Sequence, residues 1–195
     1  MSSRDDEVYA ALARAFGSVG LRWYLFGAQA AIIHGAVRFT EDIDVTVDLA
    51  GAATSVLVTA LRAEGLLPRF EDDEFIAQTR VIPVTHEPTG VPVDVVLAGP
   101  GIEDLFFDGA RPTMIGNTEV PVARAEDLVT MKILAGRPKD IEDCTAIIAA
   151  GADHFDEERT RSLLGVLEHA LDQSDLLPVF EECRRRAALA RRRPS

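Results

Sequence analysis

Two aspartates separated by one residue are the part of the sequence whose types and spacing most directly suggest chemistry. Asp42 and Asp44 lie in the run EDIDVTVDL, where polar and apolar residues alternate as in a β-strand. Alternation places both carboxylates on one face of the strand, about 7 Å apart. A hard cation between them relieves their repulsion, and Mg²⁺ prefers such oxygen ligands. An Asp-x-Asp pair alone is more often turn or cap chemistry at the start of a strand.

A third aspartate lies in a second predicted strand. Asp94 is the only charged residue in the apolar segment 91–97, and a buried carboxylate without a partner is costly. A neighbouring strand that carries the first two aspartates and a metal would explain it, and an edge strand facing water is the alternative. Three carboxylates on two strands suit two-metal phosphoryl or nucleotidyl transfer, in which one metal holds the triphosphate and the other activates the attacking hydroxyl.

A strand that runs through a glycine into a helix precedes the aspartates. Residues 21–26 are apolar except for Arg22, Gly27 and Ala28 follow, and residues 28–34 have helical spacing. Free N–H groups at a helix N-terminus bind phosphate, and glycine lets the backbone approach closely. We therefore expect the amides of Gly27 and Ala28 to contact phosphate groups. A simple tight turn between strand and helix is the alternative.

The order of these parts resembles the DNA polymerase β nucleotidyltransferase superfamily. The closer resemblance is to its minimal bacterial branch, which includes the abortive-infection (AbiEii-like) nucleotidyltransferase toxins. The first matching block is Gly27-Ala28, Ala30, His34-Gly35 and an Arg-x-Thr-x-Asp-x-Asp run formed by Arg38, Thr40, Asp42 and Asp44. A later block has a helix lysine, a basic turn and an Asp-x-x-Asp helix start: Lys132, Gly136-Arg137-Pro138-Lys139, Asp140 and Asp143.

This resemblance implies a metal-dependent enzyme that moves a nucleoside monophosphate from an NTP to an acceptor hydroxyl and releases pyrophosphate. It implies that Mg²⁺ is bound by Asp42, Asp44 and Asp94. Arg38 either contacts phosphate or the acceptor, or pairs with one of the many acidic residues of the chain. The family often has serine or glycine where this chain has Ala28. Because alanine lacks the serine hydroxyl that helps to hold phosphate, the resemblance also implies weaker or altered triphosphate binding.

Lys132 and Asp140 are the other two residues to which the resemblance gives a role. Lys132 would reach the triphosphate as a point charge, whereas the alternative is a lysine that lays its stem on the core and puts its amine in water. Asp140 would be a base or a partner of Lys132. Its place after Pro138 also predicts an N-cap with an acidic first turn.

The acceptor is the part of the function that the sequence constrains least. The resemblance to toxins implies RNA, specifically the 3′ end of tRNA, with an antitoxin protein as partner. A small molecule such as an antibiotic, a protein acceptor, or a catalytically weak NTP-binding module are the alternatives. The net charge of −12 argues against a broad basic surface, but six arginines lie within residues 184–193. They form either an RNA-binding surface or a solubilising tail.

We expect an α+β fold with a small mixed β-sheet, helices on one face and an acidic cleft on the other. Residues 1–123 are predicted to form this nucleotidyltransferase core and residues 124–195 a C-terminal helical subdomain. Predicted helices span residues 5–16, 28–34, 52–64, 125–135, 140–150, 157–171 and 175–190. Predicted strands span residues 21–26, 43–49, 75–84 and 91–97, with a further strand or hairpin within 112–122.

The remaining composition predicts a soluble cytoplasmic protein. No apolar run is long enough to cross a bilayer, so we expect no membrane association. The first residues lack a basic leader and an apolar segment typical of export. The two cysteines, Cys144 and Cys183, have no metal-binding spacing and are expected to be reduced structural thiols.

Overall fold

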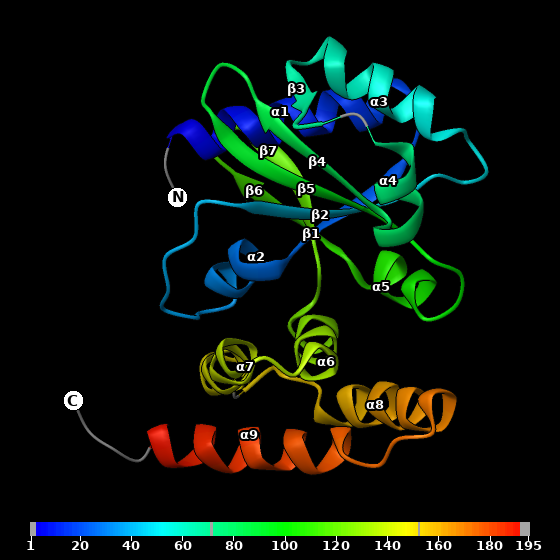
Figure 1. The fold of residues 1–195 in the computed structure, drawn as a ribbon. Helices are drawn as coiled ribbons and strands as arrows, with labels where there is room; N and C mark the ends of the chain where they lie inside the picture. Colours follow the sequence, from blue (N-terminus) through cyan, green and yellow to red (C-terminus); the bar gives the residue numbers. More distant parts are fainter. Residues whose placement is uncertain (1–2, 71, 152, 192–195) are drawn as a thin grey trace. The chain divides into compact units, whose positions relative to one another are not determined.

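The computed structural model describes residues 3–70, 72–151 and 153–191 and shows the predicted α+β fold (Figure 1). The chain divides into two units. The sheet unit comprises Met1–Gln29 and Thr40–Ala123, and the helical unit comprises Ala30–Phe39 and Arg124–Ser195. The helical unit therefore includes a segment before Thr40 that the sequence analysis placed in the core.

The sheet of the sheet unit is mixed, and its central strand is the one that carries Asp44. The strands are β1 (Arg22–Phe26), β2 (Ile43–Asp48), β3 (Leu66–Pro68), β4 (Val81–His86), β5 (Val91–Leu97), β6 (Arg111–Ile115) and β7 (Thr118–Val122). Within the described residues their order in the sheet is β3-β4-β5-β2-β1-β7-β6. β2 pairs in parallel with β5 and antiparallel with β1.

The apolar face of the sheet forms the core of this unit. Ile43, Val45 and Val47 of β2 are fully buried, as strand alternation predicts for one face. Helix α1 (Ser3–Ser18) covers this face, since the ring centroids of its Phe16 and of Trp23 on β1 lie 5.2 Å apart. Helix α3 (Thr54–Ala63) packs against α1.

The opposite face, which carries Asp44, is partly covered by a helix that the sequence analysis did not anticipate. Helix α5 (Glu103–Gly109) places the ring of Phe107 4.9 Å from that of Tyr24 on β1. Tyr24 is paired with Thr46 of β2, so it shares the face of Asp44. Part of the polar face is therefore sheltered by aromatic packing beyond the aspartates.

The predicted strand at residues 75–84 is wrong in its first half. Helix α4 (Asp73–Thr79) occupies it, and Asp72 caps this helix by accepting a hydrogen bond from the Phe75 N–H at 2.9 Å. An acidic first turn and a capping aspartate favour a helix start, which outweighed the apolar residues that follow. Arg80, with φ of +57°, ends the helix before β4 begins.

Four helices make up most of the helical unit: α6 (Ala125–Ala135), α7 (Pro138–Ala150), α8 (Glu157–Leu171) and α9 (Leu176–Arg191). Helix α7 packs against α6 and α9, and α8 packs against the same two helices. Cys144 on α7 and Cys183 on α9 are buried and not disulfide-bonded. None of the helices in the described ranges is long and apolar enough to span a membrane.

Candidate active site

Strand register brings two of the predicted catalytic aspartates side by side on the sheet unit. Asp44 on β2 is the direct partner of Asp94 on β5. Adjacent strands are about 4.8 Å apart, and paired residues point to the same face. Both side chains are partly exposed. Asp42 lies immediately before β2, two residues from Asp44, and is exposed to solvent.

Gly27, which follows the last residue of the neighbouring strand β1, leaves room for the carboxylate of Asp44. Phe26, the last residue of β1, is paired with Asp44, and Gly27 follows it with φ of +67°. A Cβ atom at Gly27 would lie 2.0 Å from Oδ2 of Asp44. Asp44 therefore lies directly against the backbone where helix α2 (Gly27–Ile33) begins. Any side chain at position 27 would displace the carboxylate.

Two of the predicted carboxylates have donor chemistry that suits a divalent ion. Across the described ranges, no group of three or more His, Cys, Asp or Glu side chains is arranged to hold a metal. Asp42 and Asp44 offer oxygen donors of the type that Mg²⁺ prefers, and the missing side chain of Gly27 leaves room for the Asp44 carboxylate. These two residues therefore fit a Mg²⁺ ion by the chemistry of their donors.

Asp94 has a partner that the sequence analysis missed. The guanidinium of Arg69, which directly follows β3, forms an ion pair with Oδ1 of Asp94. The two residues are 25 positions apart, and two antiparallel strand pairings lie between them. No local pattern in the sequence reports such a contact.

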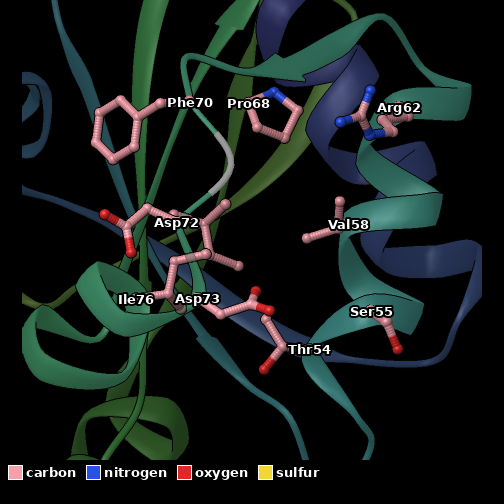
Figure 2. Close-up of a pocket in the computed structure, with 10 residues that line it drawn as sticks. Thr54, Ser55, Val58, Arg62, Pro68, Phe70, Asp72, Asp73 and Ile76 are labelled. Carbon is pink, nitrogen blue, oxygen red and sulfur yellow. The ribbon is translucent and has the colours of Figure 1, made fainter.

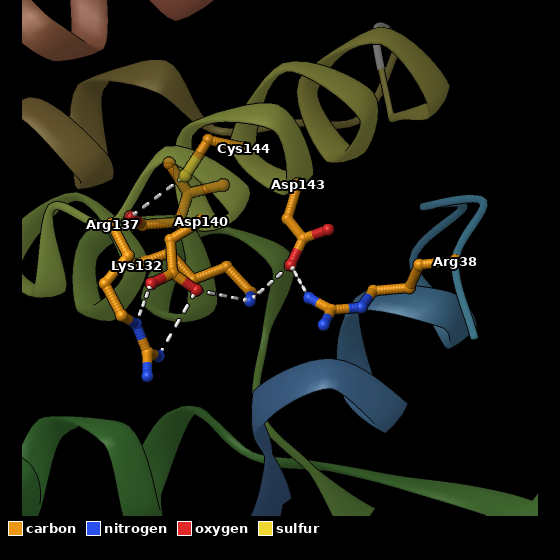
Figure 3. Close-up of polar contacts among 7 residues, drawn as sticks. Arg38, Lys132, Arg137, Asp140, Asp143 and Cys144 are labelled. Atoms are coloured by element: carbon orange, nitrogen blue, oxygen red, sulfur yellow. Dashed lines mark hydrogen bonds and ion pairs between the residues drawn. The ribbon is translucent and has the colours of Figure 1, made fainter. Parts of the chain in front are cut away.

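The second block of predicted residues forms a buried ionic cluster in the helical unit (Figure 3). Lys132 on α6 is 5% exposed, and its Nζ donates to Asp140 at 3.2 Å and to Asp143 at 2.6 Å. Both aspartates lie on α7 and are also buried. The lysine amine is therefore not in water, and the alternative of a surface-directed lysine is wrong.

Two arginines complete this cluster. Arg38 donates from Nη1 to Asp143 at 2.6 Å, and Arg137 donates to Asp140. Burial alone would raise the pKa of Asp140, but the hydrogen bond from Arg137 and the charge of Lys132 hold it below its ordinary value. Asp140 is thus a partner of Lys132.

The predicted N-cap role of Asp140 is wrong. Arg137 occupies the N-cap position of α7, and Pro138 begins the helix. Asp140 lies in the first turn, where its carboxylate is taken up by Lys132 and Arg137 instead of by backbone N–H groups. Pro138 sets the start of α7, because proline is favoured at the first residue of a helix.

The C-terminal arginines are largely engaged with acids of their own unit. Arg184 pairs with Glu157 and Glu181, and both Arg185 and Arg186 pair with Glu182. Arg191 is exposed at the end of α9. Two further residues of the predicted cationic surface, Arg192 and Arg193, lie outside the described residues.

A pocket of about 420 Å³ lies in the sheet unit between α3, α4 and the strands β3 and β4 (Figure 2). Ile82 lines it and is paired with Val95, whereas the adjacent Pro83 is paired with Asp94. Neighbouring residues of a strand point to opposite faces. The pocket therefore opens on the face away from Asp94 and is not part of the aspartate site.

Comparison with known proteins gives a fold and no closer relative. No family model and no curated protein sequence matches the chain. Its structure resembles that of ANT(2'')-Ia in complex with adenylyl-2''-tobramycin, with a TM-score of 0.59, 15% identity, and 87% of this chain and 99% of that chain covered.

Two further solved structures have a similar fold. An antigenic nucleotidyltransferase-like protein from Paracoccidioides brasiliensis has a TM-score of 0.53 at 17% identity, with 93% of this chain and 94% of that chain covered. The lincomycin-bound lincosamide antibiotic adenylyltransferase LnuA has a TM-score of 0.50 at 16% identity, with 73% and 94% covered. At such identities the likeness concerns architecture alone, and by that measure the chain has a nucleotidyltransferase fold.

Proposed function

We propose that the protein is a metal-dependent nucleotidyltransferase, which transfers a nucleoside monophosphate from an NTP to an acceptor hydroxyl. The observation that carries this proposal is the register of Asp44 with Asp94, beside a glycine whose missing side chain makes room for the Asp44 carboxylate. The nucleotidyltransferase fold supports it. In the fold, these carboxylates lie on the polar face of the sheet, where solvent reaches them.

The proposed reaction is a displacement at the α-phosphorus. The acceptor hydroxyl oxygen forms a bond to that phosphorus, the bond from the phosphorus to the β-phosphate oxygen breaks, and pyrophosphate leaves. Asp42 and Asp44 would hold Mg²⁺, which neutralises charge on the phosphates. Asp94 would orient the hydroxyl and take its proton. The amides of Gly27 and Ala28 would contact the phosphates.

The roles assigned to Arg38, Lys132 and Asp140 stay predictions. These residues form one cluster of the helical unit, and each cation in it already has a carboxylate partner. A triphosphate contact by Lys132 would require the phosphate to compete with Asp140 and Asp143. The exposed member of the cluster is Arg137, whose side chain is 62% exposed.

A small-molecule hydroxyl is the acceptor that the observations favour. The arginines at positions 184–186 are neutralised by Glu157, Glu181 and Glu182, and binding of RNA needs cations that are available to phosphates. ANT(2'')-Ia, described as an antibiotic-resistance factor, is similar in fold over 99% of its own chain. An RNA acceptor and an antitoxin partner rest on the sequence resemblance to the toxins.

A single labelling reaction tests both the proposed nucleotidyl transfer and the identity of its acceptor. The protein is incubated with Mg²⁺ and each of four α-³²P-labelled NTPs, together with total cell RNA and a panel of hydroxyl-rich antibiotics that includes tobramycin and lincomycin. Release of pyrophosphate with label on a small molecule supports the favoured acceptor, and label on RNA supports the toxin-like function. No pyrophosphate release with any NTP and acceptor would contradict the proposed reaction. Asp44→Asn is the matched inactive control.

A further inference from the structure

A single row of residues runs across the sheet at the level of the aspartates. Phe26 on β1, Asp44 on β2, Asp94 on β5 and Pro83 on β4 are successive register partners. The row continues to Arg69, whose backbone N–H donates to the carbonyl oxygen of Pro83 at 2.9 Å. The backbone position of Arg69 is therefore fixed, with the single strand β4 between it and Asp94 on β5.

The local sequence directs the Arg69 side chain to this carboxylate. Pro83 has a compact ring, so no long side chain stands between Arg69 and Asp94 on that face. Pro68 and Phe70, the neighbours of Arg69, line the pocket on the other face (Figure 2). Alternation then sends Arg69 to the aspartate face, where its guanidinium pairs with Asp94.

The charge of Asp94 is already compensated by a basic side chain. The guanidinium of Arg69 forms an ion pair with Oδ1 of Asp94, and the backbone N–H of Arg69 is held by its hydrogen bond to Pro83. A second divalent ion at Asp94 would have to displace this guanidinium.

We propose that Arg69 takes the position of a second metal ion at Asp94, so that the chain binds one divalent ion, at Asp42 and Asp44. This inference rests on the proposed function. Arg69 engages Oδ1 of Asp94, which leaves Oδ2 to accept a hydrogen bond from the acceptor hydroxyl. The fixed positive charge of the guanidinium stabilises negative charge that develops on the attacking oxygen.

The competing account is that Arg69 and Asp94 form an ordinary surface ion pair. Their side chains are 40% and 38% exposed, and such pairs contribute only about 0–1 kcal/mol. A second ion would then displace the arginine readily. The two accounts predict different numbers of bound ions, which can be counted without turnover.

Mn²⁺ binding by the full chain, followed by calorimetry and by the electron paramagnetic resonance signal of free Mn²⁺, gives this number. We expect one ion for the native chain, two for Arg69→Gln, and one again for Arg69→Gln combined with Asp94→Asn. Arg69→Lys, which keeps the charge, should bind one ion. Arg111→Gln is the matched control, because it removes the same charge from β6 at the other edge of the sheet.

The outcomes distinguish a failure of the role proposed for Arg69 from a failure of the proposed nucleotidyltransferase function. Two ions bound to the native chain, or one ion bound to Arg69→Gln, would overturn the role of Arg69 and leave the nucleotidyltransferase proposal standing. No ion bound to the native chain would overturn the metal site at Asp42 and Asp44, and both proposals with it. A second ion in Arg111→Gln would show that the count follows overall charge and would also overturn the role of Arg69.

Discussion

Replacement of Gly27 by alanine tests the arrangement at the start of α2 most directly. The new Cβ would lie 2.0 Å from Oδ2 and 2.7 Å from Cγ of Asp44. Ordinary contacts of this kind begin near about 3.5 Å, so the carboxylate must move by more than about 1 Å. We expect Gly27→Ala to lose divalent-ion binding and to slow transfer by about 100-fold or more, the scale of a misplacement of this size.

The same substitution also has a cost in stability, which is a separate effect. Gly27 has φ of +67°, and an alanine in this left-handed region costs about 1–2 kcal/mol. For a chain of this length the melting temperature should fall by roughly 2–8 °C. A loss of metal binding caused only by partial unfolding would therefore have to be separated from displacement of Asp44.

Gly51→Ala provides the matched control. Gly51 also has a positive φ, +85°, but no atom lies within 4 Å of the position of its Cβ. It should show the backbone cost without the clash, and so lose stability while it keeps metal binding and activity. Calorimetric titration with Mn²⁺ and a thermal melt of both variants measure the two effects. Metal affinity in Gly27→Ala equal to that of Gly51→Ala would refute the close contact between Gly27 and Asp44.

Three further substitutions probe the carboxylates and the ionic cluster. Asp44→Asn should fold normally and lose Mn²⁺ binding and transfer, because a neutral amide is a poor ligand at a charge-dependent site; unchanged titration curves would remove Asp44 from the site. Lys132→Ala leaves two buried carboxylates without their shared amine and should lower the free energy of unfolding by about 3–5 kcal/mol in a urea titration, whereas native stability would mean that Arg38 and Arg137 suffice. The lowered pKa of Asp140 means that its charged form stabilises the fold above its ordinary value of 3.8, and that this contribution is lost as the pH falls through the lowered pKa. Asp140→Asn should therefore flatten the dependence of melting temperature on pH below about pH 4, and an unchanged acid limb would assign that dependence to other groups.

The sequence predicted the elements whose pattern is local. The alternation in β2 and β5 and the helical spacing of α6 and α8 gave bounds within a residue or two of those observed. Short elements were missed, because β3 and α5 have few residues in which a period can show. The strand predicted at residues 75–84 failed where cap chemistry at Asp72 decided the conformation.

The residues of the candidate site also divide into those that a local sequence pattern predicts and those that it does not. Asp42 and Asp44 are visible because their i, i+2 spacing is itself the signal, and Gly27 because a glycine between strand and helix is a recognisable turn. The pairing of Lys132 with Asp140 followed from a resemblance. The second partner of Lys132, Asp143, became evident only from the packing of α6 against α7. The carboxylate partners of Arg38 and Arg137 likewise became evident only from the structure.

A sequence motif does not reveal which basic side chains compensate the charge of its carboxylates, and Arg69 is an example. Its link to Asp94 depends on two strand pairings, on a proline that keeps the face clear between them, and on a backbone hydrogen bond to that proline. None of these has a fixed spacing from the aspartates in the sequence. Three aspartates in a motif suggest two metal ions only as long as no basic side chain lies in register with one of them. The number of ions therefore has to be argued from the whole row of residues across the sheet and not from the carboxylates alone.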